Sequence, residues 1–147
     1  MRTLAYAAFS LAILALAGCG KSDTPTWAGP PDPGTGGTVA VEDFAAYEQD
    51  VDERWERSAA MAAAEFLRLD ERTAAATTIE GRASAEGAGP ETVTVTLDGL
   101  LDDSVRAERW TLTFTPEGEN YVLTGATWAQ RCQSGRGHQY FSSDLCA

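Results

Sequence analysis

The residues best suited to chemistry gather near the C-terminus, between Trp128 and Cys146. This stretch holds the chain's single histidine, His138, and the glycines on either side of Arg136 permit the positive φ angles of a tight loop. In a chain of net charge −11, a constrained loop that presents a guanidinium and an imidazole could recognise a carboxylate or a phosphate. The candidate binding residues are Arg136, His138, Tyr140 and Trp128.

A structural role for the same residues is the alternative. In that interpretation Arg136 pairs with a neighbouring carboxylate, and His138 lies in solvent. The aromatic side chains of Tyr140 and Phe141 then close the open end of a sheet. The residue types and their spacing leave both interpretations open.

Sequence signatures of catalysis are sparse in this chain. Gly-x-Ser-x-Gly and the P-loop do not occur, and the two glycines around Arg136 lack the third glycine of a dinucleotide fingerprint. A Ser-His-Asp triad would have to use His138, and the spacing of the nearby serines does not favour it. Paired carboxylates, as in a glycosidase, stay open with 22 acidic residues. We expect a non-catalytic domain without a metal or cofactor.

A second reactive group is the thiol of Cys19, close to the N-terminus. Arg2 precedes an apolar run over residues 4–16, and small residues precede Cys19, which is the pattern of a secretory signal peptide. Leu16-Ala17-Gly18-Cys19 resembles the lipobox of bacterial lipoproteins. The resemblance implies cleavage after residue 18 and acylation of the Cys19 thiol, for example with palmitate. The apolar run would span about 20 Å as a helix, short of a hydrocarbon layer of about 30 Å.

The lipobox resemblance also implies a location in the cell envelope, with acyl chains on Cys19 as the membrane attachment. In a diderm host, Gly20 and Lys21 imply export to the outer membrane, facing the periplasm. In a monoderm host the protein would lie on the outer face of the cytoplasmic membrane. An envelope protein or the cell wall would be its partner.

Cleavage after residue 18 would remove one charged residue, Arg2. The remaining chain then has 10 Lys and Arg against 22 Asp and Glu, a net charge of −12. Nucleic-acid affinity depends largely on basic side chains, so this balance argues against a nucleic-acid partner. It argues equally against electrostatic docking on anionic lipid.

With Cys19 acylated, Cys132 and Cys146 remain as a pair. In an oxidising, exported compartment we expect them to form a disulfide. Closing a loop of about 15 residues would stabilise the fold by about 3 kcal/mol. The rival interpretation, a metal site with His138, has no Cys-x-x-Cys or His-x-x-x-His spacing to support it. The pattern R-C-x-x-G-R-G-H-x-x-F-S-x-x-x-C, from Arg131, resembles the tail of small uncharacterised bacterial envelope proteins.

The sequence divides into a signal peptide (1–18), a lipidated cysteine with a tether (19–41) and a single domain (42–147). Residues 20–40 hold four of the six prolines and five glycines, with no apolar periodicity. We therefore predict a flexible tether of about 25 Å, or about 65 Å when extended. Trp27, within the tether, is expected in solvent or at the membrane interface.

Apolar side chains recur every three or four residues from Phe44 to Leu69, which is the stripe of an amphipathic helix. We predict one long helix over residues 42–72. Glu48, Glu56 and the other acidic residues between the apolar positions are expected on its solvated face. Glu42 and Asp43 suit the positive end of the helix dipole.

The apolar period then changes to two. Strands are predicted over 77–85 and 91–97, over a segment carrying Trp110, and over 121–130, with short turns that favour an antiparallel meander. Valines and threonines alternate in the second strand, which indicates one buried face and one threonine-covered outer face. Inward positions for both Val105 and Trp110 require a bulge between residues 106 and 108.

The predicted fold class is α+β, with one long N-terminal helix packed on a four-stranded antiparallel meander and a C-terminal disulfide loop. This order resembles the cystatin and NTF2-like architectures. It also resembles the head of type IV pilins, which has a disulfide loop in the same position. These are resemblances of fold and imply no function.

The combined observations predict a membrane-anchored envelope lipoprotein with a non-catalytic binding or interaction domain. Its contact surface would be the threonine face or the loop that carries Arg136 and His138. Two alternatives stay open, a small envelope hydrolase that uses His138 and a structural subunit of an envelope assembly.

Overall fold

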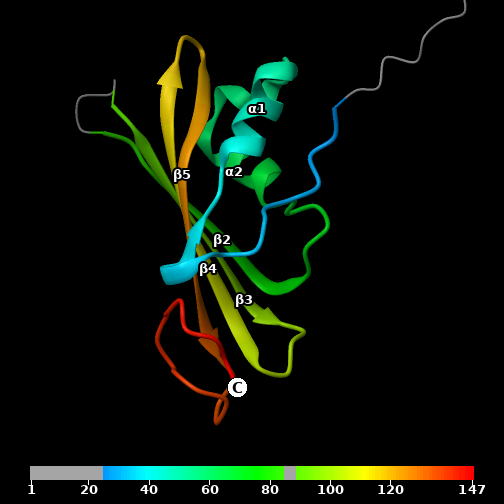
Figure 1. Cartoon of the computed structure of the whole chain (residues 1–147), viewed down its shortest axis with the longest axis vertical. Helices are drawn as coiled ribbons and strands as arrows, with labels where there is room; N and C mark the ends of the chain where they lie inside the picture. The colour runs from blue at the N-terminus through cyan, green and yellow to red at the C-terminus, as the bar shows by residue number, and fades with distance from the viewer. Residues whose placement is uncertain (1–24, 85–88) are drawn as a thin grey trace, which may run out of the picture.

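A computed structural model describes residues 25–84 and 89–147 of the chain, so the predicted signal peptide and Cys19 lie outside the described residues. Its elements are η1 (Thr35–Gly37), β1 (Thr38–Val39), α1 (Glu42–Asp50), η2 (Arg54–Arg57), α2 (Ala59–Phe66), β2 (Ala74–Arg82), β3 (Glu91–Leu100), β4 (Val105–Glu117) and β5 (Asn120–Cys132). The strands form one antiparallel sheet in the order β1-β5-β4-β3-β2 (Figure 1). Within the described ranges, none of the helices has the length and apolar character needed to cross a membrane.

The sheet has one buried face and one threonine-rich face, as the alternation in the sequence predicts. In β3, Val93, Val95 and Leu97 are fully buried, whereas the threonines between them are only partly buried. The cross-strand register places Thr94 beside Thr111, and Thr111 beside Thr127, on the outer face. The helices cover the opposite face, where the core lies.

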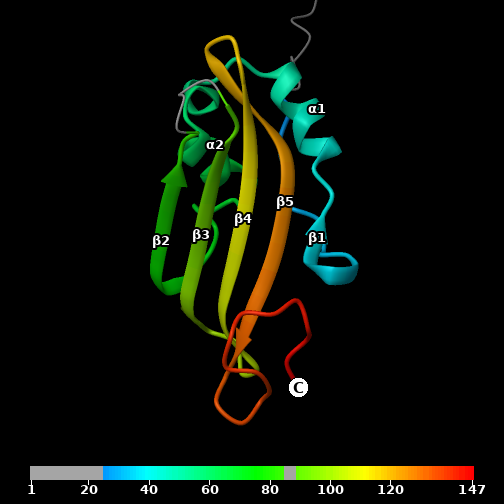
Figure 2. The ribbon, with the colours of Figure 1, turned by 90° about the vertical axis from the view of Figure 1, so that its left-hand side faces the viewer.

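The ladder between β4 and β5 shifts register between Val105 and Ala107, at the start of the segment where a bulge was predicted. A second shift lies between Thr113 and Phe114. Because a bulge bends the strand and increases its twist, these shifts contribute to the curvature of β4 and β5 (Figure 2).

The prediction of one long helix over residues 42–72 is wrong. The chain forms two short helices, α1 and α2, separated by extended residues from Val51 and by the 3₁₀ turn η2. Helix α1 ends within the acidic stretch from Glu48 to Glu53, and no basic residue lies in its last turn to offset the helix dipole. A capping box between Glu53 and Glu56 then begins η2, and Ser58 caps α2 by accepting from the Met61 N–H.

The break lets distant parts of the apolar stripe meet. Phe44 of α1 contacts Trp55 of η2 and Phe66 of α2, with ring centroids 5.8 and 5.1 Å away. All three rings pack in or against the core cluster. The burial of the apolar stripe was therefore predicted correctly, although its secondary structure was not.

Part of the predicted tether belongs to the folded domain. Trp27 is 8% exposed and lies in the core, where its Nε1–H donates to the Phe66 carbonyl at 2.8 Å. The Arg68 guanidinium holds the Trp27 carbonyl oxygen. Val39, also assigned to the tether, is buried in β1, which pairs with β5. The predicted solvent position of Trp27 is therefore wrong.

In the described part of the chain the sheet accordingly has five strands and not four, so the predicted fold, one long helix on a four-stranded meander, is wrong. The resemblances to cystatin, NTF2-like and pilin-head architectures depended on the long helix and lapse with it. Both helices lie at one end of the sheet, and the C-terminal loop lies at the other end (Figures 1 and 2). Two separate regions thus need to be considered as sites.

Candidate functional site

The C-terminal loop begins where β5 ends and is closed by a disulfide. Cys132 and Cys146 are bonded, with their Cα atoms 5.4 Å apart, which confirms the predicted pairing. Gly137 makes the closure possible because a Cβ atom there would lie 2.9 Å from Cys132 Sγ, and its φ is +137°. A side chain at position 137 would meet both the disulfide and an unfavourable backbone conformation.

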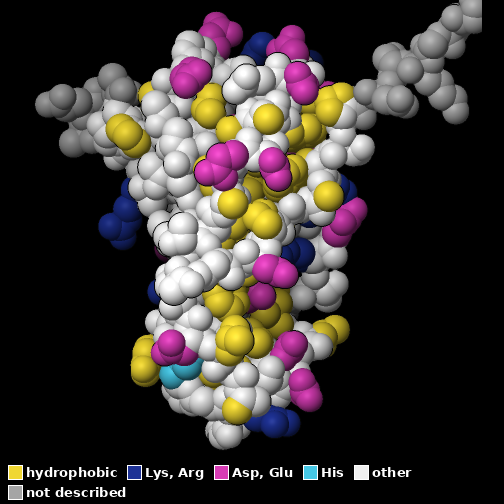
Figure 3. All heavy atoms as spheres, viewed as in Figure 1, with side chains coloured by type: hydrophobic (Ala, Val, Ile, Leu, Met, Phe, Trp, Pro, Cys, Tyr) yellow, Lys and Arg dark blue, Asp and Glu magenta, His cyan; other side chains and the backbone are white. Residues whose placement is uncertain are grey.

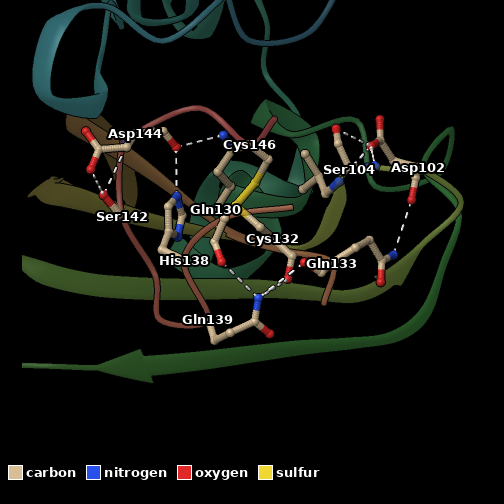
Figure 4. Close-up of a disulfide and its surroundings, with 12 residues drawn as sticks. Asp102, Ser104, Gln130, Cys132, Gln133, His138, Gln139, Ser142, Asp144 and Cys146 are labelled. Carbon is tan, nitrogen blue, oxygen red and sulfur yellow. Dashed lines mark hydrogen bonds between the residues drawn. A yellow bond between two sulfur atoms is a disulfide. The ribbon is translucent and has the colours of Figure 1, made fainter. Parts of the chain in front are cut away.

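Amide side chains fix the loop from within, as Figure 4 shows. The Gln139 Nε2 group donates to the carbonyls of Cys132 and Gln133 at 3.3 and 3.2 Å. Gln133 in turn reaches the β3–β4 turn, where its main-chain N–H donates to the Ser104 carbonyl at 2.7 Å. The loop is thereby held to the sheet independently of its disulfide.

His138 lies between two main-chain carbonyl oxygens. Its Nδ1 is 2.8 Å from the Tyr140 oxygen and its Nε2 is 3.0 Å from the Asp144 oxygen (Figure 4). A neutral imidazole carries one N–H and can donate to only one of them, whereas an imidazolium donates to both. The contact with the Asp144 carbonyl, followed by that with Tyr140, raises the pKa of His138 above 6.5.

The predicted alternative of a metal site involves Cys132, His138 and Cys146. The ligand atoms of Cys132, His138 and Cys146 lie within 4.8 Å of one another. The two sulfur atoms, however, are bonded to each other, and cysteine binds zinc only as a free thiolate. The disulfide form of the loop therefore has no metal-binding thiolates.

The outer surface of the loop carries large exposed side chains. Tyr140 is 68% exposed and Leu145 is 83% exposed. Arg136 is exposed, and its guanidinium makes no ion pair with any residue in the described part of the chain. Tyr140 lies beside His138, with ring centroids 5.3 Å apart. The loop thus brings three of the four predicted site residues, 136, 138 and 140, onto one short structured segment.

Phe141 points the other way and covers the sheet. Its ring centroid lies 3.8 Å from the guanidinium carbon of Arg109 and 5.3 Å from that of Arg131. Arg109 pairs with Thr96 in the ladder, so the ring lies on the threonine face. The structural role considered for Phe141 agrees with these contacts.

Trp128 contributes to a different surface. It lies at a groove of about 380 Å³ between the N-terminal segment and the C-terminal loop. The groove is lined by Asp32, Pro33, Gly34, Thr35, Gly36, Trp128, Ser143 and Leu145. Arg136, His138 and Tyr140 are not among its lining residues, so the structure does not join Trp128 to the other candidates.

The threonine face has a groove of its own where β1 meets β5. Its volume is about 390 Å³, and its walls include Thr111, Thr113, Thr124 and Thr127. These four threonine side chains present hydroxyl and methyl groups to the groove. The groove offers hydrogen bonds without charge, apart from Glu42 at its rim.

Two potentially functional acidic residues were missed from the sequence. Glu48 and Glu56, predicted on a solvated helix face, are 5% and 3% exposed. A signal for Glu48 was present, because it follows Phe44 by four positions and therefore lies on the buried stripe. Glu56 could have been recognised as a capping residue three positions after Glu53.

Comparisons with known proteins add no relative. No family model matches the chain, and neither a curated protein nor a solved structure matches it.

Proposed function

We propose that this chain is a bacterial envelope lipoprotein, attached to the membrane by acyl chains on Cys19. Its folded domain would be a non-catalytic binding module. The sequence Leu16-Ala17-Gly18-Cys19 after an apolar run supports the anchor. The C-terminal loop supports the binding role.

One observation favours protein recognition by this loop. It exposes Arg136, Tyr140 and Leu145 on a backbone that a disulfide and the Gln139 amide hold in place. Tyrosine and arginine are enriched among the residues that dominate binding energies at protein interfaces. A loop that is already ordered loses little conformational entropy on binding, so the exposed side chains form a prearranged contact surface.

The hydrolase alternative receives less support from the same geometry. A general base needs an unprotonated nitrogen that can reach its substrate. Both ring nitrogens of His138 face main-chain carbonyl oxygens, which favours the protonated ring. The nearby Ser142 hydroxyl donates to the Asp144 carboxylate at 2.9 Å and not to His138.

A structural subunit is the second candidate, and the free edge of the sheet favours it. Within the described residues, strand β2 (Ala74–Arg82) pairs only with β3, and all its residues after Ala74 are exposed. Glu80 and Arg82 are its only charged residues. Long, weakly charged edge strands readily pair with a second strand. If β2 pairs with a second copy, light scattering of the full chain should detect a dimer. The Thr78→Pro variant should then be a monomer.

The anchor is tested by metabolic labelling with an alkyne analogue of palmitate in a bacterial host. We expect the full chain to be labelled and the Cys19→Ser variant to remain unlabelled. Label on the serine variant would contradict attachment at Cys19.

The binding role is tested by photo-cross-linking from the loop. A photoreactive residue at Tyr140 should capture a specific protein in envelope membranes, and Arg136→Ala should reduce the capture. The same residue at Met61 serves as the control, since this side chain is 53% exposed on α2, at the other end of the sheet. An identical pattern from both positions would contradict recognition by the loop.

A further inference from the structure

A second candidate site lies at the opposite end of the sheet from the disulfide loop. There the end of α1 faces the tip of the β4–β5 hairpin across an open cavity of about 260 Å³. The cavity is lined by Glu48, Gln49, Val51, Glu56, Glu117, Asn120 and Val122. Figure 3 shows acidic side chains at the helix-bearing end of the molecule and elsewhere on the same face.

Glu48 is one of the acidic residues that line this cavity. The side chain is 5% exposed, and its Oε2 accepts the Leu123 main-chain N–H at 3.1 Å. Its Oε1 is buried and has no hydrogen-bond partner in the described part of the chain. A buried carboxylate oxygen without a donor is costly, so a missing partner is the expected explanation.

Three features of the surroundings oppose ionisation of Glu48. Burial removes the carboxylate from water, and Glu56 of η2 and Glu117 of β4 add negative charge. Glu48 also lies in the last turn of α1, at the negative end of the helix dipole. Burial, with a further contribution from these two glutamates, raises the pKa of Glu48 to about 7, although the Leu123 N–H opposes the shift.

A bound cation would offset all three effects at once. Among the described residues, no lysine or arginine lines the cavity, so this part of the chain does not supply a positive charge there. Buried acids with strongly perturbed titration occur preferentially at functional sites. A carboxylate at position 48 is unfavourable both because it is buried and because it lies at the negative end of the α1 dipole. Such locally unfavourable residues are expected at functional sites.

The cavity suits an organic cation better than a metal ion. Among the described residues, only Cys132, His138 and Cys146 bring three potential metal ligands within 4.8 Å of one another, so the three glutamates are not gathered in that way. Val51 and Val122 supply apolar walls, which suit an alkyl stem and not a hydrated ion.

The hydrogen bonding of Glu48 distinguishes between the two common organic cations. A guanidinium binds a carboxylate best through two parallel hydrogen bonds, which use both oxygens. Glu48 offers only Oε1, because Oε2 is already bonded to the Leu123 N–H. An ammonium group can donate one hydrogen bond to Glu48 Oε1 alone, while Glu56 and Glu117 add negative charge around it.

We propose that this cavity is a binding site for a primary alkylammonium group, with Glu48 Oε1 as its main acceptor. The group could belong to a lysine side chain in a peptide or to a free diamine. The proposal goes beyond the disulfide loop and does not depend on its function.

Calorimetric titration of the full chain in detergent tests this site at about pH 8. The probe is N-acetyl-lysine methylamide, and the uncharged N-acetyl-norleucine methylamide is its control. We expect heat from the lysine probe only, and an affinity at least about tenfold lower for Glu48→Gln. Glu119→Gln, an exposed acid on the same hairpin that does not line the cavity, should bind like the native chain.

Further titrations identify which kind of molecule carries the ammonium group and test the alternatives. Tighter binding of 1,5-diaminopentane than of the lysine probe would assign the site to free diamines, and the reverse order would assign it to peptides. Equal binding of the lysine and norleucine probes, undiminished binding by Glu48→Gln, or no binding of either amine would overturn the proposal. Heat from calcium chloride without heat from the amines would also overturn it. Thermal unfolding of Glu48→Gln verifies that the variant is folded.

Discussion

Trp27 and Phe66 lie 39 residues apart in the chain, and the Trp27 Nε1–H donates to the Phe66 carbonyl over 2.8 Å. Their rings stack with centroids 5.8 Å apart, and Phe44 meets the indole edge-on at 5.0 Å. This contact fastens the N-terminal segment to the second helix. It defines where the folded domain begins among the described residues.

Replacement of Trp27 should therefore destabilise the whole domain. We expect Trp27→Ala to lower the free energy of unfolding by about 3–5 kcal/mol, the usual cost of removing a buried aromatic side chain. Trp27→Phe keeps a ring but leaves the Phe66 carbonyl unpaired, at a cost of about 1–3 kcal/mol. Urea unfolding measures both values. Leu101→Ala, at a side chain that is 90% exposed, is the control, and equal stability of Trp27→Ala and this control would contradict the assignment.

Glu48 should make the stability of the protein depend on pH. The unfolded chain releases the Glu48 proton near pH 4.5, whereas the folded chain holds it to about pH 7. The folded state therefore binds more protons in this window, and stability falls as the pH rises through it. The loss should total about 3 kcal/mol above pH 7.

The Glu48→Gln variant isolates that contribution. The amide oxygen can still accept the Leu123 N–H, and the variant has no charge to bury. We expect urea midpoints of variant and native protein to agree near pH 4 and to diverge in favour of the variant up to about pH 8. A difference that stays constant over this range would show that Glu48 does not titrate as its burial implies.

His138 should titrate above its ordinary value of 6.5 because protonation completes both of its carbonyl contacts. A raised pKa means that this contribution to stability is present below pH 6.5 and is lost as the pH rises through the folded value. Proton NMR can follow the ring directly, since the chain has a single histidine. The urea-unfolded chain provides the reference, and a folded midpoint at or below 6.5 would contradict the geometry.

Reduction of the Cys132–Cys146 disulfide should lower the free energy of unfolding by about 3 kcal/mol, because it releases a loop closed across 14 positions of sequence. Thermal unfolding with and without reductant measures the change. The double variant Cys132→Ser and Cys146→Ser should be insensitive to reductant. An unchanged midpoint of the native protein on reduction would show that Gln139 and its partners hold the loop alone.

The strands were more predictable from the sequence than the helices. Alternation of valine and threonine reports directly on the two faces of a strand, and β3 follows it residue by residue. The apolar stripe from Phe44 to Leu69 predicted which residues are buried, but it did not predict the break between α1 and α2. In a straight helix Phe44 and Phe66 would lie about 33 Å apart, yet their ring centroids are 5.1 Å apart.

The errors have physical causes that a local pattern does not contain. The proline- and glycine-rich composition around Trp27 describes the backbone, whereas its burial depends on partners 17 to 39 positions away. The disulfide could be predicted because only one pairing is possible once Cys19 is assigned to acylation. The cavity at Glu48 could not, because its walls come from α1, η2 and the β4–β5 hairpin, which the sequence does not bring together.

The buried position of Trp27 also limits how far the proposed lipoprotein can extend from its membrane. Eight peptide units join Cys19 to Trp27, and a chain of that length reaches at most about 29 Å. A spacer that continued to residue 40 would reach about 65 Å. If Cys19 is acylated, the short linker holds the domain close to the lipid headgroups. The domain then contacts partners within about one domain diameter of the bilayer. Binding partners would accordingly be sought among membrane-associated proteins and the layer of wall adjoining the membrane.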